Sequence, residues 1–147
     1  MPVNFLLYTS LMRLGAYYGD SFKIECPTGS GNLMNLFEVG KVLGERLIST
    51  FVKDSSGKRP VYGAMEKFQT DPNWRDNILF FEYFHGDTGA GVGASHQTGW
   101  TGCIARVIQA NGAFTEKDLA ERDIETRAIR MGQGQEAEET ASTLVTK

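Results

Sequence analysis

The chain has 147 residues, of which 41% are hydrophobic and 22% charged, and its formal net charge is −3. This length favours one domain, and the near balance of charges argues against the basic surface of a nucleic-acid-binding protein. No apolar run reaches the roughly 18 residues of a membrane span, and the start lacks the basic region of a signal peptide. Cys26 and Cys103 are too few for a disulfide framework. We therefore expect reduced thiols in a cytoplasmic protein that binds neither nucleic acid nor membranes.

Three segments predict helices. Residues 3–18 follow Pro2, which suits the first turn of a helix, and their apolar side chains surround the axis, which predicts burial on nearly every side. Residues 33–52 have the amphipathic period of about 3.6 residues, with Gly40 and Gly44 placed for close packing on a neighbouring helix. Residues 97–109 are again largely apolar and end before Asn111-Gly112. These segments predict an all-α fold.

The last 33 residues of the chain differ in composition from the rest. Residues 115–147 have eight acidic and five basic side chains, whereas residues 1–114 have ten of each. Thr115 and Asp118 match a capping box, which predicts a short, weakly docked helix over residues 116–130. Residues 132–147 are polar and are expected to be disordered. We therefore separate a folded part, residues 1–110, from a polar tail, residues 111–147.

Residues 80–100 have the strongest signals for chemistry. The apolar run 78–84 predicts a short strand or one buried helical turn, since periodicity does not decide at this length. It contains Glu82, and a glycine-rich loop with both histidines follows before Trp100. Burial of Glu82 among aromatic rings would raise the pKa of its carboxyl, as in a general acid or base. An outward-pointing Glu is an equally good reading.

Two other kinds of site are less well supported. The pattern Gly89-x-Gly91-x-x-Ala94 matches a dinucleotide fingerprint, but that motif needs a parallel sheet, and no second strand is evident. His85 and His96 have no spacing typical of metal ligands. We expect neither a metal nor a cofactor, with both histidines as hydrogen-bonding groups of a polar pocket.

Ordered motifs give a more specific expectation. They are residues 1–4 (MPVN), 26–31 (CPTGSG), 59–63 (RPVYG), 82–84 (EYF), 87–93 (DTGAGVG) and 96–102 (HQTGWTG). Together they resemble the C-terminal part of glycoside hydrolase family 63. This is the family of processing α-glucosidase I (mannosyl-oligosaccharide glucosidase) and its bacterial relatives. The resemblance covers about residues 1–110.

The resemblance implies the C-terminal part of an (α/α)6 barrel and an inverting hydrolysis of O-glycosyl bonds in an oligosaccharide. In such a reaction one carboxylic acid protonates the leaving oxygen while a carboxylate activates water. The family's general base falls on Glu82. Candidates for sugar contacts are Trp74, Tyr83, His85, His96, Gln97 and Trp100.

The departures from the family pattern matter equally. The family's general acid is an upstream Asp with no counterpart in this sequence, so the isolated chain is expected to be inactive. The chain resembles a fragment of such an enzyme, whose missing N-terminal part would be a partner. The alternative is a non-catalytic sugar-binding or subunit module that completes a site together with a partner chain.

Overall fold

The computed structural model describes residues 1–121. The predicted disordered segment and most of the predicted helix 116–130 lie outside these residues. The α-helices are α1 (Pro2–Tyr18), α2 (Leu36–Ser49), α3 (Glu66–Thr70), α4 (Thr98–Thr101) and α5 (Ile104–Ala113). The strands are β1 (Lys23–Glu25), β2 (Leu33–Asn35), β3 (Tyr83–Phe84) and β4 (Gly91–Val92), and 3-10 turns span Gly19–Ser21 and Pro60–Tyr62.

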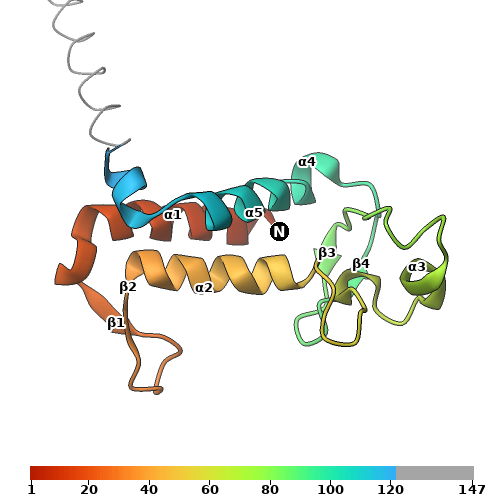
Figure 1. Ribbon diagram of the computed structural model, residues 1–147, viewed down its shortest axis with the longest axis horizontal. Coiled ribbons are helices and arrows are strands. Elements are labelled where there is room, and N and C mark those ends of the chain that lie inside the picture. The colour runs from red at the N-terminus through yellow and green to blue at the C-terminus, as the bar shows by residue number, and fades with distance from the viewer. Residues whose placement is uncertain (122–147) are drawn as a thin grey trace, which may run out of the picture.

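Three helices form the helical body of the molecule. Helices α1 and α2 run antiparallel side by side, and α5 packs against α2 (Figure 1). The β1–β2 hairpin projects beyond the start of α2, and α3 with the β3–β4 hairpin lies beyond its other end (Figure 1). The last residues of α2 therefore connect the helical body to the irregular region that contains Glu82.

Glycines allow α2 to approach its neighbours closely. A Cβ on Gly15 would lie 2.6 Å from Phe37 Cα, so the backbones of α1 and α2 touch at this point. A Cβ on Gly44 would lie 2.9 Å from a Tyr8 ring carbon and 2.6 Å from Asn111 Oδ1. Gly44 therefore makes room for α1 and for α5 at the same level. The close packing predicted for the glycines of residues 33–52 is confirmed.

One core extends through both the helical body and the irregular region. Its buried side chains are Tyr8, Met12, Phe37, Phe51, Val61, Tyr62, Phe81, Ile104 and Val107. The first three come from α1 and α2 and the last two from α5, whereas the others come from segments outside the α-helices. The irregular region is thus built on the same core as the helices.

A buried asparagine sets the start of α2. Asn35 is 4% exposed. Its side chain accepts the Glu38 N–H, while the Glu38 carboxylate accepts the Asn35 N–H, which completes a capping box. The Asn35 amide also donates to Asp20 and to Glu116, both at 3.2 Å. The helix therefore begins at Leu36, three residues later than the sequence predicts.

The predicted all-α fold is wrong, because the structure has two two-stranded antiparallel sheets, β1–β2 and β3–β4. Gly29 and Gly31, in the left-handed region at φ 79° and 73°, lie in the turn that joins β1 to β2. Strands of two or three residues are too short to give a periodic signal. The two sheets also make the interpretation as a fragment of an (α/α)6 barrel wrong, because that barrel consists of helices.

Two of the predicted helices differ in detail from the observed ones. Residues 97–109 form two helices, because α4 ends at Thr101 and α5 begins at Ile104. Helix α5 continues through Asn111-Gly112 to Ala113. The helix predicted over residues 3–18 is confirmed as α1, but its burial on nearly every side is wrong, since only Tyr8, Met12 and Gly15 are buried. No helix within residues 1–121 combines the length and the apolar character needed to cross a membrane.

The contact at Gly15 can be tested by substitution. We expect Gly15→Ala to lower the free energy of unfolding by about 1–3 kcal/mol, because the added methyl meets backbone that cannot move without separating the helices. Urea unfolding followed by circular dichroism measures this change.

Gly112→Ala is the matched control within another helix, since a Cβ there meets nothing within 4 Å. It should leave stability unchanged or raise it slightly, because Ala favours helices over Gly. Equal effects of the two substitutions would contradict the close contact of α1 with α2.

Candidate functional site

The segment from Phe80 to Trp100 is an antiparallel hairpin that runs into α4. Tyr83 pairs with Val92 and Phe84 with Gly91, so the strand alternative for residues 78–84 is correct for its last two residues. The Phe81 side chain is buried against Gly91, where any side chain would overlap its ring. The Phe84 ring contacts the Phe51 ring, with centroids 5.6 Å apart. These contacts fix the hairpin on the core.

Glu82 is held by hydrogen bonds on both sides of its backbone. Its N–H donates to the Ala94 carbonyl at 2.8 Å, and its carbonyl accepts the indole N–H of Trp100 at 3.0 Å. The Ala94 N–H in turn donates to the Glu82 carboxylate at 3.4 Å. The side chain is exposed to solvent, so it is not buried among the aromatic rings around it in sequence. The arrangement presents a backbone-anchored carboxylate at the surface.

Gly93 makes this arrangement possible. Its φ of 80° lies in the left-handed region that side chains disfavour. A Cβ at this position would lie 2.9 Å from Glu82 Oε2 and 2.8 Å from a ring carbon of Tyr83. The glycine therefore leaves the space in which the carboxylate and the tyrosine ring lie.

The start of α4 brings further candidate residues to Glu82. The Gln97 N–H donates to the Phe80 carbonyl at 2.8 Å, and His96 forms a backbone bridge with Phe80. The buried Thr101 hydroxyl donates to the Phe81 carbonyl. These bonds fix Trp100, which is 52% exposed, beside Glu82, while Tyr83 next to it in sequence is 54% exposed. Two aromatic side chains with free surface thus accompany the carboxylate.

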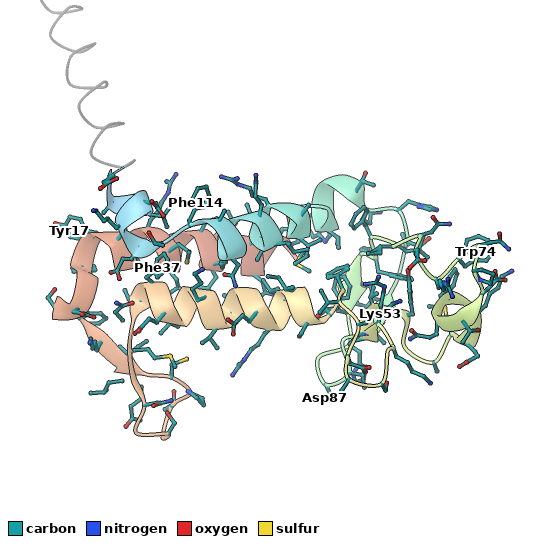
Figure 2. The ribbon with its side chains drawn as sticks, viewed as in Figure 1. Tyr17, Phe37, Lys53, Trp74, Asp87 and Phe114 are labelled. Atoms are coloured by element: carbon teal, nitrogen blue, oxygen red, sulfur yellow. The ribbon has the colours of Figure 1, made fainter. Side chains whose placement is uncertain are left out.

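The remaining candidates lie elsewhere. His85 and Asp87 belong to the turn between β3 and β4, where the Asp87 N–H donates to His85 Nδ1 at 3.2 Å. Trp74 lies beside α3 (Figure 2). Its ring packs on Phe68 at 5.3 Å, with Lys67 Nζ 5.1 Å from the ring centre. The structure therefore places Tyr83 and Trp100 beside Glu82. It joins His96 and Gln97 to Phe80 through the backbone and packs Trp74 with Phe68 and Lys67.

Sequence reasoning missed the residues that support the site. Gly93, Ala94 and Thr101 hold Glu82 and Trp100 in place, yet Ala94 acts only through its backbone and leaves no side-chain signal. The left-handed Gly93 was visible only as one glycine among several in the loop. The hydrogen bond from an amide to a carboxylate across a hairpin can be predicted only if the pairing register of the two strands is known, and the sequence does not supply that register.

The structure also bears on the alternative sites. Gly89 to Ala94 runs through the turn into β4, which pairs antiparallel with β3, rather than through a strand-to-helix turn of a parallel sheet. Within residues 1–121, no group of three or more His, Cys, Asp or Glu side chains is arranged to hold a metal ion. Cys26 and Cys103 are free thiols of intermediate burial, and burial raises the pKa of Cys103.

Comparison with known proteins gives one informative match. No family model matches the sequence, and no solved structure matches it. The chain is 51% identical over 113 residues to the uncharacterized protein YMR196W of Saccharomyces cerevisiae, a match that covers 76% of this chain. The chain spans about 10% of the length of that relative.

The match includes the candidate site wherever it begins. Because 76% of 147 residues is about 112, at most about 35 residues lie outside it. Any continuous match of that length contains the segment from Glu82 to Trp100. A segment closely similar to the one described thus forms part of a much longer yeast polypeptide.

The role of Gly93 gives a prediction for the site. Gly93→Ala should destabilise the protein by about 1–2 kcal/mol, because an L-residue is strained in the left-handed region. The amides of Glu82 and Ala94 should then exchange faster with solvent, which hydrogen–deuterium exchange by NMR measures.

Gly86→Ala serves as the control in the same loop, because a Cβ at position 86 meets nothing within 4 Å and needs no left-handed backbone. Its exchange rates at Glu82 and Ala94 should match those of the unsubstituted chain. The arrangement is wrong if both substitutions accelerate exchange at these two amides equally.

Proposed function

We propose that the chain supplies the water-activating carboxylate of an inverting glycoside hydrolase, with Glu82 as the general base. The observation that carries this proposal is the exposed, backbone-anchored Glu82 carboxylate beside the exposed rings of Tyr83 and Trp100. The resemblance of residues 82–102 to glycoside hydrolase family 63 supports the same assignment. A general base must keep a fixed position toward its water, and the hydrogen bonds to Ala94 and Trp100 supply that.

The proposed reaction divides the work between two carboxyl groups. Glu82 would take a proton from a water molecule as that water attacks the anomeric carbon. A second carboxyl group, roughly 6.5–9.5 Å away, would protonate the leaving oxygen. The resemblance puts this acid in a part of the enzyme without a counterpart in this sequence. A partner polypeptide would supply it.

The substrate class follows from the side chains near Glu82. Exposed aromatic rings such as those of Tyr83 and Trp100 combine an apolar face with a polar edge, which suits the ring of a sugar. His96, Gln97 and, from the turn, His85 offer polar groups for hydroxyls. We infer a glucose-containing oligosaccharide as substrate, and a cytoplasmic location because both cysteines are free thiols.

A non-catalytic role is the second candidate. The absence of a counterpart to the general acid favours a module that binds sugar, or completes a site together with a partner chain. In that role Glu82 would accept a hydrogen bond from a sugar hydroxyl rather than a proton from water. Binding and turnover therefore need separate measurements.

Sugar binding is tested with the isolated chain and maltotriose as the probe. Tyr83→Ala should weaken binding by about tenfold or more, as removal of an aromatic contact at the centre of a site does. Isothermal titration calorimetry measures the affinity, and Phe22→Ala is the matched control because Phe22 is 48% exposed and Tyr83 54%. Equal affinities of the two variants for maltotriose would show that Tyr83 does not contact the sugar.

Catalysis needs the long polypeptide. The isolated chain should not hydrolyse an aryl α-glucoside, and turnover that Glu82→Gln abolishes would show that a complete acid–base pair is present. In YMR196W with its matched segment replaced by this chain, Glu82→Gln should lower hydrolysis about 10²–10⁴-fold, the usual contribution of a general base.

Asp87→Asn is the control in that chimera, since Asp87 lies in the same loop but its carboxylate has no part in the proposed reaction. It should keep full activity. Hydrolysis that survives Glu82→Gln would rule out Glu82 as the base. Maltotriose binding without hydrolysis would favour the non-catalytic module.

A further inference from the structure

Helix α1 has a large exposed apolar face. We name its four most exposed aliphatic residues the outer face of α1. They are Val3, Leu6, Leu7 and Leu14, which are 77%, 65%, 49% and 45% exposed. Isolated exposed aliphatic residues are normal on a protein surface, but a continuous apolar patch marks a site of interaction.

The four residues share one side of the helix. At about 100° per residue they fall within an arc of about 100°. The buried residues Tyr8, Met12 and Gly15, which face α2, lie on the opposite side. Helix α1 is therefore apolar on two opposite sides, and only one of them is covered within the described part of the chain. A helix of this kind is typical of a position between two packed layers.

The charge of α1 distinguishes among possible occupants. Arg13 is the single charged side chain of α1. The first turn has no acidic residue and the last turn no basic residue, so no side-chain charge stabilises either end of the helix. Helices that lie on membrane surfaces have Lys and Arg along the polar face and bind anionic headgroups through them. One arginine is too little for that, so the face is suited to an uncharged protein surface.

The yeast relative indicates which protein surface this is. A segment 51% identical to this chain occupies 10% of that relative, so about nine-tenths of the polypeptide lies outside it. We propose that the outer face of α1 docks against an apolar helical or sheet surface formed by those flanking regions. Helix α1 then becomes the middle layer between α2 and the flanking polypeptide. This proposal is independent of any hydrolase activity.

Accessibility of single cysteines tests the proposal. The chimera of YMR196W that contains this chain is prepared with Cys26 and Cys103 replaced by serine. Leu6→Cys or Leu33→Cys is then added. Leu33 is the matched control, because it is 64% exposed and Leu6 65%, but it lies on the β1–β2 hairpin. We expect a maleimide to modify position 6 at least about tenfold more slowly than position 33 in the chimera. The two should react at similar rates in the isolated chain.

The possible results separate the occupants. Equal modification of both positions in a chimera with a cooperative thermal transition would overturn the proposal. A chimera that shows no cooperative thermal transition would also overturn the proposal, because the flanking polypeptide would then not accommodate the outer face of α1. Sedimentation of the isolated chain checks the remaining case. A dimer that Leu6→Asp dissociates and Leu33→Asp does not would assign the outer face of α1 to a second copy instead.

Discussion

The contact of α1 with α2 is the constraint on which the rest of the structure depends. At Gly15 the backbone of α1 lies against the backbone of Phe37, so the two helices are in direct backbone contact there. This approach places Tyr8 and Met12 in the core and orients α2 along its whole length. The end of α2 then determines where the irregular region begins. The Val61 N–H donates to the Thr50 carbonyl at 2.8 Å, and the Arg59 guanidinium donates to the Phe51 carbonyl at 2.7 Å.

The candidate site is the last link of this chain of contacts. Phe51 packs on Phe84, and Phe81 covers Gly91, so both strands of the hairpin are attached to the core by a ring. Glu82 lies between these two attachments in the sequence, and its side chain is exposed to solvent. The carboxylate is therefore exposed while its backbone is rigidly supported, which is the usual relation between a functional side chain and its scaffold.

The sequence predicted the long, periodic helices well and missed most of the short strands. Helices α1 and α2 were recognisable because apolar residues recur along them, and Gly40 and Gly44 were correctly read as sites of close packing. Strands β1, β2 and β4 were missed, and β3 was left as one of two alternatives, because two or three residues carry no period. The segment from Phe80 to Trp100 was singled out by its composition, and its role as a site stays a prediction. Its geometry depends on the register of β3 with β4 and on the φ angle of Gly93, and neither can be read from residue types.

Gly44 has a consequence for how this protein can vary. It makes room for the Tyr8 ring of α1 and for the Asn111 side chain of α5 at one level, and the Tyr8 hydroxyl lies 3.4 Å from Asn111 Oδ1. A larger residue at position 44 cannot be accommodated by a change in one neighbour alone, because it meets both. Positions 8, 44 and 111 should therefore change together among related sequences. A relative with alanine at 44 would need smaller or differently oriented side chains at 8 and at 111.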